Sequence, residues 1–110
     1  EQGSETRICL TPPEMIISDI KNIARDLSTL SFEPEAALII SCAGRKSVLK
    51  DGLKFEPLDI LKGCPALKAI SGYPSFGEIG PLKSDEGYEE TLFHNMTAII
   101  LTLGMTSNEE

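Results

Sequence analysis

Three groups of polar residues beside glycines have the side chains to do chemistry. The first group, Ser41–Arg45, directly follows an apolar run of strand length. In sheets with helical crossovers, ligands bind at the ends of such strands. Arg45 has the planar fork that recognises a carboxylate or a phosphate, and Gly44 lets backbone N–H groups approach a ligand. The alternatives are that Arg45 pairs with a surface carboxylate and that Cys42 is a small buried apolar residue.

The second group is the segment from Gly72 to Pro81, which is rich in glycine and proline and has an unusual backbone path. Glu78 lies in it between Gly77 and Gly80. Its carboxylate could receive an amine or pair with Arg45. The alternative is a solvated acid in an ordinary turn.

The third group is Phe93-His94-Asn95, which contains the only histidine of the chain. A lone histidine is more often a hydrogen-bonded structural residue than a catalyst. Cys42 and His94 could form a thiolate–imidazole pair, oriented by Asn95 or Glu78, if the fold brings them together. Cysteine-dependent catalysis is therefore one alternative, with non-enzymatic binding preferred. No cysteine or histidine spacing indicates zinc, and we expect no metal and no cofactor.

A long amphipathic helix is expected to support these groups. Apolar residues recur at helical spacing and predict a helix from about residue 13 to 30; they are Ile16, Ile20, Ile23, Leu27 and Leu30. Thr11 and Glu14 have the spacing of a capping box at its start. A second, short helix is predicted over Glu56–Gly63, with Pro57 near its start and Gly63 as its stop.

Short strands make up the rest of the predicted fold. They are expected at Arg7–Leu10, Ala36–Ser41, Leu67–Ile70, Glu78–Leu82 and Leu92–Leu103. Residues 42–46 and 71–77 are predicted to be turns and residues 83–90 an acidic loop. For residues 47–54 the pattern favours no particular secondary structure. The run Ala36–Ser41 is apolar throughout, which favours a strand covered on both faces. A helix between the first two strands suits a parallel crossover. The fold class is therefore α/β, bordering on α+β, with a single mixed sheet of about four to five strands and one long and one short helix.

Composition limits the class of protein. The chain has 110 residues, enough for a single domain over residues 1–110, with frayed ends at 1–5 and 106–110. It has 10 basic and 17 acidic residues, a net charge of −7, so nucleic acid and anionic membrane surfaces are not expected partners. No apolar run approaches the length of a membrane span. We expect a processed chain or a piece of a longer protein, because the first residue is Glu1.

Cysteine usage indicates a reducing compartment. The three cysteines, Cys9, Cys42 and Cys64, are odd in number and have no CxxC spacing. Reduced thiols and a cytoplasmic location are therefore predicted. The glycosylation pattern Asn95-Met96-Thr97 is not expected to be used, because no secretion signal is visible.

Taken in order, the three groups resemble the C-terminal domain of the FIST family, the F-box and intracellular signal transduction proteins. The matching stretch runs from the apolar strand Ala36–Cys42 to the strand Thr97–Leu103. Between them it includes Gly44-Arg45, Gly72, Gly77-Glu78-Ile79-Gly80 and His94-Asn95. The resemblance implies a ligand-sensing signal-transduction module, not an enzyme, whose ligand is a small molecule such as an amino acid. It also implies an N-terminal FIST domain of the same protein as a partner.

Resemblance and residue chemistry lead to the same predicted ligand site. Arg45 would bind a carboxylate and Glu78 an ammonium group, which together suit an amino acid. The predicted site residues are Cys42, Gly44, Arg45, Gly77, Glu78, Gly80, His94 and Asn95. The alternative is a protein-interaction or structural module in which Arg45 and Glu78 pair internally. Function would then lie in an exposed sheet edge or in the acidic loop Asp85–Glu90, and the domain could form a homodimer.

Overall fold

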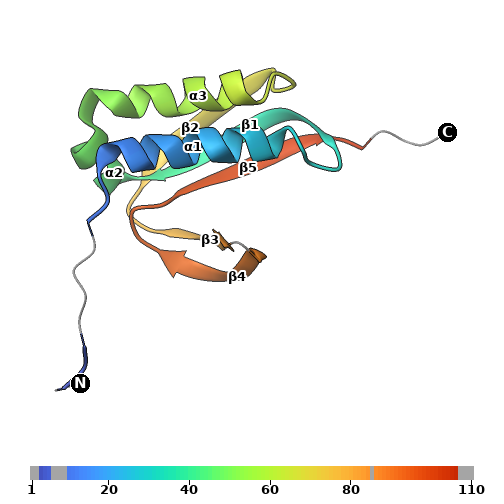
Figure 1. The fold of residues 1–110 in the computed structure, drawn as a ribbon. Coiled ribbons are helices and arrows are strands. Elements are labelled where there is room, and N and C mark those ends of the chain that lie inside the picture. Colours follow the sequence, from blue (N-terminus) through green and yellow to red (C-terminus); the bar gives the residue numbers. More distant parts are fainter. Residues whose placement is uncertain (1–2, 6–9, 85, 107–110) are drawn as a thin grey trace.

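The computed structural model describes residues 3–5, 10–84 and 86–106. Its helices and strands are shown in Figure 1: α1 (Pro13–Leu27), β1 (Glu33–Cys42), α2 (Ala43–Leu49), the 3₁₀ helix η1 (Lys50–Lys54), α3 (Phe55–Gly63), β2 (Ala69–Ser75), β3 (Glu78–Ser84), β4 (Gly87–His94) and β5 (Ala98–Met105). Most of the predicted strand Arg7–Leu10 and most of the ends predicted to fray lie outside the described residues. No described helix is long and apolar enough to cross a membrane.

The strands form two sheets. In the first sheet the order is β2-β1-β5, with β2 parallel and β5 antiparallel to β1. The second sheet is the antiparallel hairpin β3–β4, which lies below β5 in Figure 1. The predicted mixed α/β fold is confirmed, although its strands are divided between two sheets and do not form one. A parallel crossover joins β1 to β2 through α2, η1 and α3. The predicted crossover is a different one, since it begins at residues 7–10, most of which lie outside the described residues.

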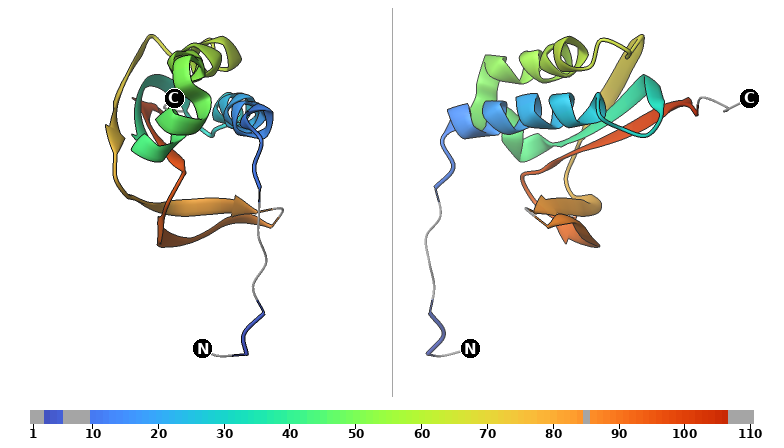
Figure 2. Two further views of the ribbon diagram at one scale, coloured as in Figure 1. Left: turned by 90° about the vertical axis from the view of Figure 1, so that its left-hand side faces the viewer. Right: turned by 45° about the vertical axis from the view of Figure 1, so that its right-hand side comes forward.

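Helices cover one face of the three-stranded sheet. Figure 2 shows α1 and α3 side by side on the same side of it. The buried core joins both helices to β1 and consists of Ile20, Ala24, Leu27, Ala37, Ile39, Ile60, Cys64 and Leu67. On β1, Ala37 and Ile39 point into this core, whereas Leu38 and Ile40 alternate to the other face and are only half-buried. The prediction that this strand is covered on both faces is therefore wrong for the described residues.

The start of α1 differs from the predicted capping box. Pro12 is the N-cap, with φ −67° and ψ 150°, and no side chain caps the helix. A residue that precedes a proline is restricted to extended conformations, so Pro13 makes Pro12 the boundary. Thr11 consequently lies one residue outside the cap position and does not bond to the amide of Glu14.

The end of α1 also comes earlier than predicted, at Leu27 and not near residue 30. The hydroxyls of Ser28 and Thr29 donate to the carbonyls of Arg25 and Asp26, at 2.6 and 2.8 Å. The backbone N–H groups of Ser28 and Thr29 donate to the same two carbonyls, at 3.1 and 2.9 Å. A tightened last turn and the two short side chains together satisfy the end of the helix.

Three segments predicted as turns or loops are regular. Residues 43–49 form α2, residues 71–75 extend β2, and the hairpin β3–β4 occupies most of residues 83–90. Conversely, the predicted strand Leu92–Leu103 is two strands, separated at Asn95–Thr97 where Met96 has a φ of 65°. A positive φ at a residue with a side chain interrupts an extended strand. Pairing with β1 supplies the hydrogen bonds that carry β2 through Gly72 and Pro74.

Candidate functional site

The three predicted groups come together at the carboxyl end of β1. In the sheet register, Cys42 lies opposite Ser75 at the end of β2, and Ser41 lies opposite Ala98 at the start of β5. The backbone N–H of Cys42 donates to the carbonyl of Thr97 at 2.9 Å. The turn at residues 95–97 therefore lies directly against the end of the central strand.

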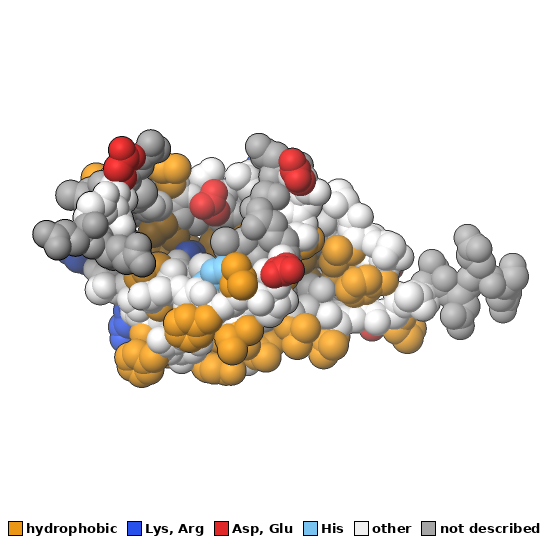
Figure 3. Space-filling model, turned by 90° about the horizontal axis from the view of Figure 1, so that it is seen from below, with side chains coloured by type: hydrophobic (Ala, Val, Ile, Leu, Met, Phe, Trp, Pro, Cys, Tyr) orange, Lys and Arg blue, Asp and Glu red, His pale blue; other side chains and the backbone are white. Residues whose placement is uncertain are grey.

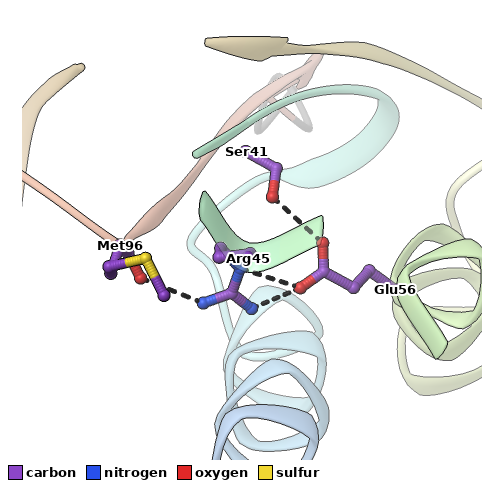
Figure 4. A network of polar contacts seen from close by, with 4 residues as sticks. All are labelled: Ser41, Arg45, Glu56 and Met96. Carbon is purple, nitrogen blue, oxygen red and sulfur yellow. Dashed lines mark hydrogen bonds and ion pairs between the residues drawn. The ribbon is translucent and has the colours of Figure 1, made fainter. Parts of the chain in front are cut away.

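A buried ion pair is the main feature of this region. Figure 4 shows that Arg45 of α2 points toward Glu56 of α3. The Arg45 Nε donates to Glu56 Oε1 at 3.0 Å and its Nη2 group contacts the same oxygen, while Ser41 Oγ donates to Glu56 Oε2 at 3.2 Å. Arg45 Nη1 also donates to the Met96 carbonyl at 3.4 Å. The exposed fractions of Arg45 and Glu56 are 6% and 5%, so the pair is removed from water. Arg45 forms neither the surface pair nor the pair with Glu78 considered from the sequence.

Glu56 was missed as a site residue, although the sequence contains a signal for it. It lies four residues before Ile60, and both side chains are buried on the same side of α3; Cys64, the C-cap residue four positions further on, is buried as well. A carboxylate on the apolar side of a helix needs a hydrogen-bonded or charged partner. That spacing alone would have indicated a buried ion pair, without naming Arg45 as the partner.

Glu78 forms a second buried group, separate from the first. Its exposed fraction is 1%. The hydroxyl of Ser75 donates to Oε1, and the hydroxyl of Thr97 donates to Oε2 at 3.2 Å. Among the described residues, no cationic side chain forms an ion pair with Glu78. Its carboxylate thus joins the corner between β2 and β3 to the turn at residues 95–97 and is not the solvated acid of an ordinary turn.

Cys42 and His94 have different partners. The Cys42 thiol lies 3.4 Å from Asn95 Oδ1 and donates to it. The Nε2 atom of His94 lies 2.8 Å from the carbonyl of Gly80, which requires the tautomer with a proton on Nε2. Neither contact joins the thiol to the imidazole. Within the described part of the chain, no group of three histidine, cysteine or acidic residues could hold a metal ion.

The glycines of the predicted site are approached by side chains of this chain. A Cβ atom at Gly44 would lie 2.5 Å from Met96 Sδ, and one at Gly77 would lie 2.7 Å from the Phe93 ring. A Cβ at Gly80 would lie 2.8 Å from Ile99. Close packing against these side chains accounts for glycine at the three positions. That the glycines also let the backbone approach a ligand stays a prediction.

A cleft of about 650 Å³ lies beside the ion pair, between α1, β5 and the hairpin. Among the described residues, Arg45 is the only cationic one that lines it, and α1 contributes the acidic side chains of Asp19 and Asp26. The rest of its lining is Ile20, Asn22, Ile23, Leu27, Pro81, Tyr88, Met96, Thr97, Ala98, Ile99 and Ile100. Of the predicted site residues, Arg45 lines this cleft and Glu78 does not.

These features define a small mixed α/β domain with buried polar groups at its strand ends and an adjoining cleft. The family model of the FIST C domain matches residues 1–81, so this chain belongs to the FIST C domain family, which is associated with signal transduction. The matched segment includes Arg45, Glu56 and Glu78, whereas His94 and Asn95 lie beyond it. No curated protein and no solved structure gives a significant match.

Proposed function

We propose that this domain is a cytoplasmic sensory module that binds a free amino acid or a small carboxylate in the cleft between α1 and β5. The observation that carries the proposal is the position of Arg45, a buried guanidinium on the wall of this cleft. Buried cations are costly unless they are held in place, and Glu56 holds this one. A guanidinium oriented before binding is well suited to a carboxylate.

The remaining hydrogen-bonding capacity of Arg45 supports this role. Its guanidinium has five N–H donors, and Glu56 and Met96 accept from Nε, Nη2 and Nη1. One N–H therefore remains on each of the two terminal nitrogens. A ligand carboxylate could accept both of them without displacing Glu56.

Acidic residues of α1 take the place that Glu78 held in the sequence-based hypothesis. Glu78 is occupied by Ser75 and Thr97 and does not itself line the cleft, although Thr97 does. Asp19 and Asp26 both line the cleft, about two turns apart on the helix. The carboxylate of Asp19 would attract the ammonium group of an amino acid, and the isoleucines beside it would contact an apolar side chain.

The proposed role is binding without catalysis. The different partners of Cys42 and His94 support it, since a nucleophile needs its base within hydrogen-bond reach. The excess of acidic residues supports a partner other than nucleic acid or an anionic membrane. An N-terminal FIST domain of the same protein remains the proposed partner in signalling.

Isothermal titration and thermal unfolding of the 110-residue chain with amino acids and small carboxylates test the proposal. A ligand at 100 times its dissociation constant adds about 2.7 kcal/mol of stability, which raises Tm by roughly 10 °C or more. Arg45→Lys keeps the charge but loses the fork, and we expect it to weaken binding by at least about tenfold.

Asp19→Asn should weaken amino acids but not simple carboxylates. Asp51→Asn is the matched control, because Asp51 is exposed on η1 and does not line the cleft. The absence of any bound ligand in the panel would contradict the proposal, as would equal affinity of Arg45→Lys and the unmodified chain.

A protein-interaction module is the second candidate. Its sequence-based form relied on an internal Arg45–Glu78 pair, and the internal partner of Arg45 is instead Glu56. The observation that favours it is the half-exposed apolar face of the three-stranded sheet. No ligand would then stabilise the domain, and Arg45→Lys would alter only its stability.

A further inference from the structure

The three-stranded sheet has an apolar face that no described helix covers. Leu38 pairs in register with Leu101, and Ile40 pairs with Tyr73 and Ile99, so these side chains share the face opposite the helices. We call this the outer face. Figure 3 shows hydrophobic side chains gathered along the lower border of its view of the molecule.

The two edges of this sheet differ in how they are protected. β2 contains Pro74, which has no N–H to donate, and prolines of this kind block pairing at an edge. β5, at the other edge, contains neither proline nor a charged residue over Ala98–Met105. Among the described residues it pairs only with β1. Its outer edge is therefore the unprotected one.

The exposed part of β5 is its second half. At the start of the strand, Ala98, Ile99 and Ile100 line the cleft between α1 and the hairpin, and Ile99, on the outer face, lies against Gly80 of the hairpin. Beyond them, Leu101, Leu103 and Met105 are 53%, 63% and 72% exposed. These three residues alternate along the strand, so they all lie on the outer face. Large apolar side chains beside an unpaired strand edge are typical of a site where another strand adds.

We propose that the edge of β5 over Leu101–Met105 pairs antiparallel with the same edge of a second copy of this chain. A two-fold axis beside Leu103 would place the two Leu103 side chains together and each Leu101 next to Met105 of the other copy. The arrangement is isologous, since both copies contribute the same residues. Pairing would also bury part of the exposed apolar surface of Leu101, Leu103 and Met105.

Charge is the reason for choosing a second copy as the occupant. Two chains that each carry a net charge of −7 repel each other over most of their surface. β5 has no acidic residue, so a two-fold contact along it brings no like charges face to face. Two copies of this strand can therefore lie side by side without charge repulsion between them.

The protected edge of β2 limits the assembly to two copies. Pairing through β5 would join two sheets of three strands and leave a β2 strand with Pro74 at each end. Further strand addition is disfavoured there, so the expected product is a closed dimer and not a fibre. This inference is independent of ligand binding, and β5 lies beyond the segment that the family model matches.

Sedimentation equilibrium of the 110-residue chain over about 1–500 µM tests the proposal, since it resolves affinities in that range. We expect a reversible monomer–dimer equilibrium. The double substitution Leu101→Lys with Leu103→Lys should raise the dimer dissociation constant at least about tenfold, because it places like charges opposite one another. Leu58→Lys is the matched control, since Leu58 is 45% exposed on α3, and it should leave the constant unchanged.

Hydrogen exchange of the unmodified chain locates the contact without any substitution. At higher protein concentration, alternate amides within residues 101–105 should become protected, while those on the outer edge of β2 should not. A chain that stays monomeric at every concentration would overturn the proposal. So would an unchanged constant in a folded lysine variant, protection elsewhere than β5, or growth into larger assemblies.

Discussion

The buried pair of Arg45 and Glu56 should behave as one energetic unit. Arg45→Met leaves the Glu56 carboxylate buried with only the Ser41 hydroxyl, and Glu56→Leu leaves the guanidinium with only the Met96 carbonyl. Each single change strands an uncompensated charge at a position that is 5–6% exposed. Removing one partner of a buried pair costs about 3–5 kcal/mol, a large part of the 5–15 kcal/mol that stabilises a typical domain.

The double substitution should be much milder than either single one. It replaces both charges with apolar side chains of similar size, and the main loss is the acceptor of the Ser41 hydroxyl, worth about 1 kcal/mol. The loss in free energy of unfolding of the double variant should therefore be smaller than the summed losses of the two single variants by at least about 2 kcal/mol. Urea unfolding followed by circular dichroism measures these differences, and each single variant should lose roughly 10 °C or more in Tm.

The chain contains a matched control for this cycle. Lys68 and Glu35 also form an ion pair, but their side chains are 70% and 38% exposed. Exposed pairs gain little because water and salt screen them, so the same cycle on Lys68 and Glu35 should give a coupling far smaller than that of the buried pair. Additive effects at Arg45 and Glu56, or single variants as mild as those of the exposed pair, would refute the reasoning.

Two further predictions concern close packing and pH. Gly63→Ala should cost about 1–3 kcal/mol of stability by overpacking, because its Cβ would lie 2.5 Å from the Cβ of Ala24 on α1. Gly52→Ala is the control and should be close to neutral, since its nearest neighbour would lie 3.8 Å away. The hydrogen bond and charge of Glu35 raise the pKa of Lys68 above its ordinary value of 10.5. Between neutral pH and about pH 10, the small difference in unfolding midpoint between the unmodified chain and Lys68→Gln should be constant, and it should disappear as the pH rises through the raised pKa; a difference that grows over this rise would contradict the prediction.

Much of the fold follows from local patterns. The stripe of isoleucines at helical spacing predicted α1, and Ile16 and Ile20 are indeed buried on it. The apolar run from Ala36 predicted β1, the central strand of the main sheet. Errors arose where pairing between distant segments overrode local preference. β2 stays extended through Gly72 and Pro74, two residues that disfavour strands, because its pairing with β1 stabilises it.

The candidate site was only partly predictable. Arg45 and Glu78 were both identified as polar residues with structural or ligand roles, and both prove to be buried at the end of β1. Their partners were not predicted. Glu56 reaches Arg45 across η1, which connects α2 to α3, and Thr97 reaches Glu78 because a turn separates β4 from β5.

The sequence by itself determined that this is an acidic mixed α/β domain, with its main helix, its central strand and the polar groups beside them. These features depend on residue spacing within a few turns or a single strand. Only the tertiary structure decided that Arg45 pairs with Glu56, that Asp19 and Asp26 face the same cleft as Arg45, and that the β5 edge is open. Such contacts join residues distant in the chain, and they are selected by the packing of helices against the sheet.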